Sequence, residues 1–206
     1  MNKKTLCIAT HNANKVREMA AVLAPFWEVK STVDYPEMAE QDEIAETGDT
    51  FLANATLKAV ATSQIVPDYV LADDSGLECD ALAGAPGVFS ARYGGIPSST
   101  EKNNAKLLEE LNRVDAKTPQ QRAARFRCVL VLAKESEVVA SFEGVCEGTM
   151  ALAPKGTAGF GYDPLFIPQG YARTFGQLTD KTKMNLSHRG LALKQFVAWC
   201  KANPLE

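Results

Sequence analysis

The sequence predicts an α/β fold built around a mixed β-sheet, and three observations lead to this prediction. A short apolar run at residues 6–9 is followed by a segment with helical periodicity at residues 15–23. A second apolar run, at residues 69–72, is short and uninterrupted, as expected for a buried strand. Residues 125–132 and 138–146 are apolar or alternating and are joined by a polar turn, which predicts an antiparallel hairpin. The strand–helix order and the hairpin together indicate a sheet of both parallel and antiparallel strands.

Composition narrows the class of protein. The chain has 206 residues, of which 46% are hydrophobic and 23% charged, so we expect one globular domain over residues 1–206. A net charge of −3 argues against a surface that binds nucleic acid. The five cysteines are widely scattered, which favours reduced thiols over a zinc site or a disulfide framework. No segment resembles a secretion signal or a membrane span, and we expect a cytoplasmic protein without membrane partners.

The first strand leads into a candidate anion site. Val16, Met19, Ala20 and Leu23 recur at helical spacing, and Thr10, Asn12 or Asn14 can cap that helix. Free backbone amides and the helix dipole at such a start attract a phosphate. Lys15 in the first turn is unfavourable for the helix itself, so it is either solvated or compensated by a ligand's negative charge.

A second strand is expected at residues 27–33, followed by a polar and acidic segment at 34–46 and a helix that begins near Phe51. Thr47 or Asp49 is the expected N-cap of this helix. Asn54 and Lys58 lie four residues apart and share one helical face, which we expect to be solvated.

The run at residues 69–72 ends in Asp73, Asp74, Ser75 and Gly76, which we expect to leave the strand. Neighbouring residues of a strand point to opposite sides, so one aspartate can face a pocket while the other serves a different partner. Carboxylates at the end of a buried strand suit a hard cation such as Mg²⁺. The alternative is a simple turn in which Asp and Ser bond the backbone.

The second half supplies loops and two more helices. A loop rich in Gly and Pro at residues 82–95 precedes a helix capped by Ser98, Ser99 or Thr100. In the segment 154–164, glycines flank Phe160 and Tyr162, and either ring could stack on a flat ligand unless the segment is simply a mobile loop. A polar segment follows at residues 174–183.

Ser187 is the expected N-cap of the last helix, which Ala192, Phe196 and Trp199 would bury. His188 and Arg189 at the start of that helix repeat the anomaly seen at Lys15, because a positive charge there opposes the dipole.

Separated carboxylates, cations at helix starts and an aromatic glycine loop together indicate an enzyme that hydrolyses nucleotide phosphates. Carboxylates bind a metal, the metal and the cations bind phosphate oxygens, and aromatic rings hold a base. Two alternatives stay open. The chain could be a catalytically silent nucleotide-binding module, or a serine hydrolase with Ser75 as nucleophile and His188 as base, although Asp-Ser-Gly is not the Gly-x-Ser-x-Gly motif.

Six motifs, in order along almost the whole chain, resemble the inosine/xanthosine triphosphate pyrophosphatase family, also called Ham1-like. They are Thr10-His11-Asn12-x-x-Lys15; Glu46-Thr47-Gly48-x-Thr50-Phe51-x-x-Asn54-Ala55-x-x-Lys58-Ala59; Ala72-Asp73-Asp74-Ser75-Gly76-Leu77; Gly84-Ala85-Pro86-Gly87-x-x-Ser90-Ala91-Arg92-Tyr93; Gly159-Phe160-Gly161-Tyr162-Asp163-Pro164; and Ser187-His188-Arg189.

The resemblance implies a long curved mixed sheet flanked by helices, two lobes with a deep cleft between them, and a homodimer. It also implies Mg²⁺-dependent cleavage of dITP, ITP and XTP to the monophosphate and pyrophosphate, which removes non-canonical purines from the nucleotide pool. Asp74 is then the expected proton acceptor, and Glu46 and Asp74 the expected metal ligands. The expected substrate-binding residues are Thr10, His11, Asn12, Ala13, Asn14, Lys15, Ser75, Phe160, Gly161, Tyr162, Asp163, Lys183, His188 and Arg189.

Four places depart from the family pattern as the resemblance presents it. They are His11, the pair Ala13-Asn14, Gln177, and the pair Lys181-Thr182. None of them removes an expected catalytic group, so the departures bear on affinity and selectivity and leave the reaction in place. The preferred purine base is not fixed by the sequence.

Overall fold

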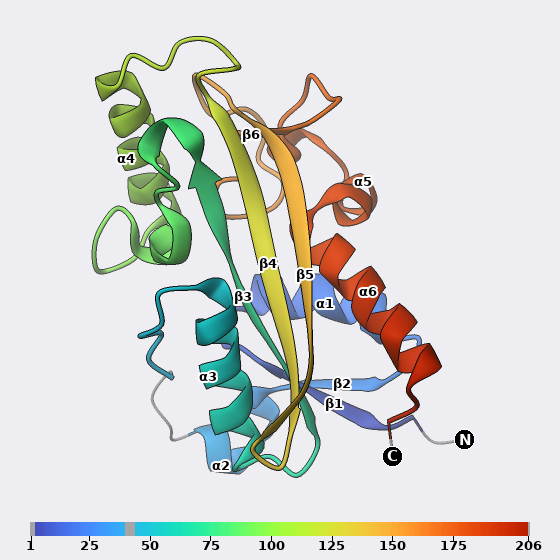
Figure 1. The fold of residues 1–206 in the computed structure, drawn as a ribbon. Coiled ribbons are helices and arrows are strands. Elements are labelled where there is room, and N and C mark those ends of the chain that lie inside the picture. Colours follow the sequence, from blue (N-terminus) through green and yellow to red (C-terminus); the bar gives the residue numbers. More distant parts are fainter. Residues whose placement is uncertain (1–2, 40–43, 206) are drawn as a thin grey trace. The chain divides into compact units, whose positions relative to one another are not determined.

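The computed structural model describes residues 3–39 and 44–205, which form a sheet in the order β2-β1-β3-β4-β5-β6 (Figure 1). The strands are β1 (Thr5–Ala9), β2 (Glu28–Ser31), β3 (Tyr69–Cys79), β4 (Ala123–Lys134), β5 (Glu137–Met150) and β6 (Phe166–Pro168). The helices are α1 (Ala13–Leu23), α2 (Pro36–Ala39), α3 (Phe51–Ser63), α4 (Thr100–Arg113), α5 (Asp180–Leu186) and α6 (His188–Ala202).

The sheet is mixed, as the sequence predicts. β1 pairs in parallel with both β2 and β3, and β5 pairs antiparallel with β6. β4 and β5 are neighbours joined by Glu135 and Ser136, both with positive φ, which is the geometry of a two-residue hairpin turn. The α/β class with a mixed sheet is therefore confirmed, whereas the two lobes and the cleft between them stay a prediction.

The chain packs as two compact units. The first comprises Met1–Asp74, Cys128–Gly144 and Ala192–Glu206, and the second comprises Ser75–Arg127 and Val145–Leu191. The boundaries fall inside β3, β4, β5 and α6, so no Gly- or Pro-rich linker marks them in the sequence. That residues 1–206 act as a single domain stays a prediction.

In the first unit, the predicted strand–helix start is confirmed. Asn12 caps α1, because its side-chain oxygen accepts from the backbone amides of Asn14 and Lys15 at 3.0 and 3.3 Å. Met19 and Leu23 form the buried face of α1. Figure 1 shows α3 and α6 on opposite sides of the sheet, and on the α6 side Phe142 of β5 packs edge-on against Phe196 at 5.5 Å.

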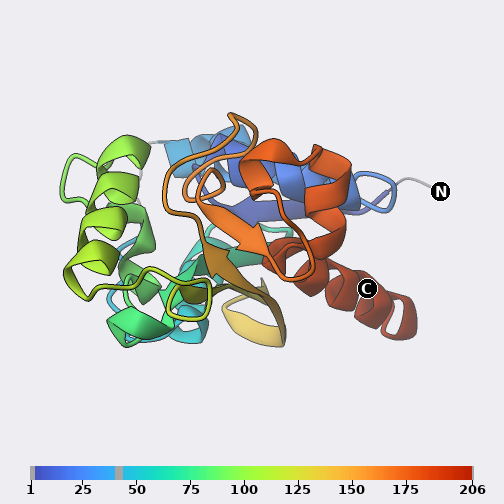
Figure 2. The same cartoon turned by 90° about the horizontal axis from the view of Figure 1, so that it is seen from above.

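The second unit has its own hydrophobic core. Figures 1 and 2 show α4 and α5 on opposite sides of β4. Ser99 caps α4 through the amide of Lys102, as one of the three predicted caps. The core consists of Leu77, Cys79, Leu107, Leu111, Ala116, Ala124, Phe126, Cys146, Met150, Tyr162, Leu165, Phe166 and Phe175.

Four local predictions are corrected by the structure. β3 does not end at residue 72 but continues through the acidic pair to Cys79. The second strand is shorter than 27–33, because Thr32–Asp34 form a 3-10 turn. Thr50, rather than Thr47 or Asp49, caps α3. Helices α2 and α5 were not predicted.

Of the acidic segment 34–46, residues 40–43 lie outside the described residues. Within the described ranges, no helix combines the length and the apolar character that crossing a membrane requires.

Candidate active site

In the first unit, the turn between β1 and α1 carries Lys15 to a buried aspartate. The Lys15 ammonium lies 2.5 Å from Asp73 Oδ1 and 3.4 Å from the Asp73 carbonyl oxygen. The thiol of Cys128 lies 3.1 Å from the other carboxylate oxygen, Asp73 Oδ2. Asp73 is completely buried, so its charge depends on these partners. Lys15 is therefore held by an ion pair, which corrects the alternative of a simply solvated lysine.

The next residue along β3 faces a different partner. Lys58 of α3 lies 2.5 Å from Glu46 Oε1, 3.3 Å from Asp74 Oδ1 and 2.8 Å from the Asp73 carbonyl oxygen. The alternation of strand side chains is thus confirmed, with Asp73 toward Lys15 and Asp74 toward Lys58.

The expectation of a solvated Lys58 is wrong, because only 9% of the residue is exposed. Burial alone would lower the pKa of Lys58, but the carboxylates of Asp74 and Glu46 outweigh it and raise the pKa. Lys58 therefore stays positively charged inside the protein. It acts as a fixed internal cation that joins two acidic side chains from different parts of the chain.

Asp74 has the most unusual environment of this group. It is 5% exposed, and its Oδ2 has no hydrogen-bond partner among the described residues. Burial raises the pKa of Asp74 to about 6, opposed by Lys58 and assisted by the negative charge of Glu46. A buried carboxylate oxygen with no partner costs free energy unless a ligand completes it.

Asn54 of α3 holds the segment that carries Glu46. The side-chain oxygen of Asn54 accepts from the backbone amide of Gly48 at 2.7 Å, and Asn54 is completely buried. A Cβ at Gly48 would lie 2.7 Å from Ala53 Cβ and 2.9 Å from Asn54 Oδ1. Asn54 and Lys58 thus secure this segment at two points, one through the backbone and one through the Glu46 carboxylate, so the predicted solvated face is wrong for both.

The donor set fits a divalent cation. Three carboxylates (Glu46, Asp73, Asp74) surround two lysines (Lys15, Lys58), so these five groups carry a net charge of −1 when ionised. The Lys58 ammonium shows that Glu46 and Asp74 lie close enough to share one positive charge. The unpartnered Asp74 Oδ2 offers a further oxygen to a metal ion. Mg²⁺ is commonly bound through one or two carboxylates, the remaining ligands being water and phosphate oxygens. Among the described residues, no group of three or more His, Cys, Asp or Glu side chains is arranged to hold a metal ion.

In the second unit, a phenylalanine lies close to two cations. The Lys183 ammonium is 4.7 Å and the Arg189 guanidinium 5.7 Å from the centre of the Phe160 ring. Lys183 also forms a 2.6 Å ion pair with Asp163, whose carboxylate accepts the backbone amide of Phe160 at 2.7 Å. Arg189 donates to Ser75 Oγ at 2.8 Å. The structure thus brings five of the predicted substrate-binding residues of this unit together.

Ser75 is not presented as a nucleophile by this contact. A guanidinium keeps its proton in proteins and cannot act as a general base. The hydrogen bond from Arg189 therefore gives no support to the serine-hydrolase alternative.

Of the two aromatic candidates, the structure favours Phe160. The ring of Tyr162 belongs to the core, is 4% exposed and donates its hydroxyl to the Ser90 carbonyl at 2.8 Å. The expectation that Tyr162 could stack on a ligand is therefore corrected. Gly161 is fixed through its carbonyl oxygen, which accepts from Asn104 at 3.1 Å.

The two predicted histidines differ in setting. His11 is exposed in the β1–α1 turn, whereas His188 is 5% exposed and stacks on Phe126 with ring centres 4.6 Å apart and planes 11° apart. Ser187 caps α6 as predicted, because its hydroxyl accepts the backbone amide of Gly190 at 3.1 Å.

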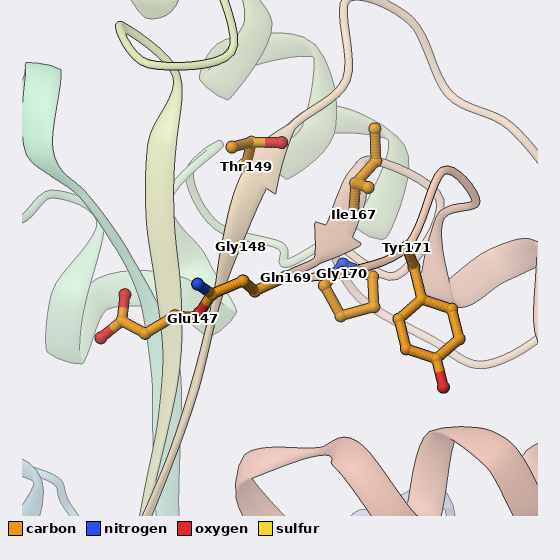
Figure 3. A pocket seen from close by; sticks show the side chains of 8 residues that line it. Glu147, Gly148, Thr149, Ile167, Gln169, Gly170 and Tyr171 are labelled. Carbon is orange, nitrogen blue, oxygen red and sulfur yellow. The ribbon is translucent and has the colours of Figure 1, made fainter.

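A cavity of about 500 Å³ lies elsewhere in the second unit, beside β5 and β6 (Figure 3). It is lined by Glu147, Gly148, Thr149, Ile167, Pro168, Gln169, Gly170 and Tyr171. None of the predicted site residues is among them, and Glu147 is engaged with Arg125 at 3.1 Å. The cavity is therefore separate from the candidate site.

Comparison with known proteins identifies the family. The family model described as the Ham1 family matches residues 6–199. This chain belongs to the Ham1 family. It is 49% identical to the dITP/XTP pyrophosphatase of Exiguobacterium sp. over 194 residues, covering 94% of this chain and 95% of that protein. It is 46% identical to the dITP/XTP pyrophosphatase of Halalkalibacterium halodurans, covering 95% and 98%. The solved structure of a HAM1 protein from Coxiella burnetii superimposes with a TM-score of 0.86 at 35% identity, covering 97% of this chain and 99% of that one.

Sequence reasoning missed three supporting residues of this Ham1 site. Asn54 and Lys58 were visible as a pair four residues apart, close after the acidic Glu46, but spacing does not say which face of a helix is buried. Phe126 lies in a strand whose sequence pattern predicts that its side chain is buried. That pattern does not predict which residue, here His188, packs against it. Asp73 and Lys15 were both recognised, but the ion pair between them was not.

Proposed function

We propose that this chain is a Mg²⁺-dependent nucleoside triphosphate pyrophosphatase that converts dITP, ITP and XTP to the monophosphate and pyrophosphate. The membership of the Ham1 family and the names of its close relatives support the reaction. The single observation that carries the proposal is Asp74, a buried carboxylate with one unpartnered oxygen beside Glu46 and the internal cation Lys58.

Glu46 and Asp74 would hold the metal, since both carboxylates already share one cation and Asp74 has a free oxygen. When bound, Mg²⁺ supplies charge neutralisation at phosphate oxygens and makes a nearby water more acidic. Asp73 is engaged with Lys15 and Cys128, so it is assigned to positioning Lys15.

Asp74 would accept the proton of the attacking water. The water oxygen forms a bond to the α-phosphorus, the bond from that phosphorus to the bridging oxygen breaks, and pyrophosphate leaves with the electron pair. With a pKa near 6, Asp74 is mostly ionised at neutral pH and is still a better base than an ordinary aspartate. Such transfer requires mainly positioning and charge stabilisation from the protein.

The triphosphate would be bound by Thr10, His11, Asn12, Ala13, Asn14 and Lys15. They form the turn into α1, where backbone amides and the helix dipole favour anions. Lys15 contributes a positive charge whose position is already fixed by Asp73. The positive charge at the helix start, unfavourable on its own, is explained by this role.

The purine would be recognised by Ser75, Phe160, Gly161, Asp163, Lys183, His188 and Arg189. Tyr162 would hold their loop from the core through its hydrogen bond to the Ser90 carbonyl. Phe160 offers the stacking ring, Lys183 and Arg189 offer donors to the 6-keto oxygen of hypoxanthine or xanthine, and Asp163 holds Lys183 in place. Adenine carries an amino group there and would leave buried donors unpaired. Mismatches of this kind reject an analogue by roughly four orders of magnitude.

Two further parts of the proposal follow from the resemblance. We propose a homodimer, to be tested by light scattering of the purified protein. We also propose a cytoplasmic location, which agrees with five free cysteines, four of them buried.

The deciding experiment is an assay with ITP, XTP, GTP and ATP in Mg²⁺ or EDTA, run in ¹⁸O-water with both products identified. We expect Mg²⁺-dependent monophosphate and pyrophosphate, ITP or XTP far ahead of ATP, and one ¹⁸O in the monophosphate. Label in the pyrophosphate would contradict attack at the α-phosphorus. Binding of ITP without turnover would contradict an enzyme and favour a binding module.

A further inference from the structure

Phe126 of β4 is the centre of an aromatic cluster in the second unit. Its ring centre lies 4.7 Å from that of Phe166, 6.2 Å from that of Phe175 and 4.6 Å from that of His188. Phe126 is 7% exposed and none of the six motifs contains it. The same buried ring therefore contacts three aromatic side chains, one histidine and two phenylalanines.

Both contacts lead to the proposed base-recognition residues. The imidazole of His188 lies nearly parallel to the Phe126 ring, with 11° between the planes. Phe175 is nearly parallel to the same ring, at 19°, and the Lys183 ammonium lies 5.9 Å from the centre of Phe175. Lys183 in turn contacts Phe160 and Asp163. Phe126 thus contacts His188 directly and Lys183 through Phe175, and both are proposed base-recognition residues.

We propose that Phe126 is a positioning residue for base recognition, and this inference rests on the proposed function. Its ring fixes the plane of the His188 imidazole. Through Phe175, it also fixes the position of the Lys183 ammonium.

The physical reason lies in the torsion of the histidine ring. The rotation of an imidazole about its Cβ–Cγ bond is broad, so the side chain alone does not fix the direction of its N–H groups. A parallel aromatic neighbour at van der Waals distance restricts that rotation. Hydrogen bonds weaken steeply as their angle departs from linear, so a fixed ring plane gives a stronger and more selective bond to the purine.

Phe166 is the matched control. It belongs to the same cluster, is completely buried, and its described ring contacts are to Phe126 and Phe175. A general loosening of the core should therefore follow from Phe166→Leu as well as from Phe126→Leu. Because Phe166 also contacts Phe175, an effect that is confined to Phe126 belongs to its contact with His188.

The first measurement is NMR of the imidazole protons in Phe126→Leu, Phe126→Met, Phe166→Leu and wild-type protein. The chain has two histidines, so His11→Gln assigns both sets of signals. We expect the His188 signals to lie upfield in wild type because of the stacked ring. In both Phe126 variants the His188 chemical shifts should move toward those of the exposed His11. In Phe166→Leu they should keep the wild-type values.

The second measurement is the kinetics of the same variants with ITP. We expect Phe126→Leu and Phe126→Met to raise KM about tenfold, the worth of one good hydrogen bond, with kcat changed less than about twofold. Phe126→Tyr, which keeps a flat ring, should restore the wild-type KM. Phe166→Leu should leave KM near wild type after correction for any loss of folded protein.

Unmoved His188 signals, or equal KM changes in the Phe126 and Phe166 variants, would overturn the inference. Wild-type protein that hydrolyses none of the nucleotides would instead overturn the proposed function. The inference would then be decided by titration with ITP: His188 signals that respond in wild type but not in Phe126→Leu support it, and equal responses in both reject it.

Discussion

At the scale of single residues, Asp74 shows how a functional group can be costly to the fold. A carboxylate buried beside a second carboxylate is less stable than one in water, and one of its oxygens has no partner among the described residues. Lys58 offsets part of this cost and keeps the group mostly ionised at neutral pH. The same arrangement makes Asp74 a stronger base than a solvent-exposed aspartate.

We expect Asp74→Asn to reduce kcat at least about a thousandfold while the fold survives, because an amide cannot accept the proton. Asn has nearly the same shape, so circular dichroism and gel filtration should match wild type. The control is Asp49→Asn, an exposed acid that precedes α3. An Asp74→Asn variant that keeps full activity would remove Asp74 from the reaction.

The same substitution should stabilise the metal-free protein, in a way that depends on pH. The folded pKa of about 6 lies above the ordinary value of 3.8, so the folded state binds this proton more tightly than the unfolded state. The tighter proton binding of the folded state therefore stabilises the fold fully below pH 4. This stabilisation is lost as the pH rises through 6.

We expect Asp74→Asn and wild type to have similar Tm at pH 4 in EDTA. At pH 7 the variant should be more stable, by about 3 kcal/mol. Thermal unfolding across this range provides the measurement. A difference that stays constant with pH would show that Asp74 has an ordinary pKa.

At the scale of elements, α3 supports the Glu46 segment from two points one turn apart. We expect Asn54→Ala to weaken Mg²⁺ binding about tenfold, because the Gly48 amide loses its partner and Glu46 loses its fixed position. Calorimetric titration with Mg²⁺ measures this without any turnover. Leu52→Ala, on an exposed position of the same helix, is the control. Equal Mg²⁺ affinity in Asn54→Ala and wild type would contradict a positioning role for Asn54.

The elements that could be predicted are those whose signals are local. The cap at Asn12 and the cap at Ser99 lie directly beside the helices they begin, and both were expected. The cap of α3 was placed one to three residues too early, because Thr47, Asp49 and Thr50 are all suitable residue types. The short helix α5 was missed, since its sequence is mostly polar and offers little periodicity.

The site could be predicted only in part, because its supporting contacts are long-range. β3 continues through Asp73 and Asp74 although acids are disfavoured in strands. Lys15, Cys128 and Lys58, from three other elements, lie against these two carboxylates. None of these pairings can be predicted from the residues next to it in the sequence. The burial of Lys58 and the stack of Phe126 on His188 depend on tertiary structure in the same way.

At the scale of the whole molecule, the two units carry different parts of the proposed recognition. The first unit contains Lys15, Glu46 and Asp74, the proposed phosphate and metal ligands. The second contains Phe160, Lys183 and the other residues proposed to recognise the base. This division predicts two distinct kinetic classes of variant.

We expect Lys15→Ala to lower kcat/KM by a similar factor for ITP, XTP, GTP and ATP, since every substrate has the same triphosphate. Lys183→Met should lower kcat/KM for ITP but not for ATP, and so reduce the preference between them. Kinetics with all four nucleotides distinguish the classes. A Lys15 variant that changes the preference, or a Lys183 variant that does not, would contradict the division.

The low reactivity of the native thiols allows the two units to be labelled selectively in solution. Burial raises the pKa of Cys7, Cys79 and Cys146 to about 12 and that of Cys200 to about 11, so thiolate is scarce at neutral pH. A cysteine introduced at Val33 or Ile96, which are 66% and 88% exposed and lie in different units, would react with a maleimide dye far faster than these native thiols. A doubly labelled molecule could then report, by energy transfer, how the distance between its two units responds when a nucleotide binds.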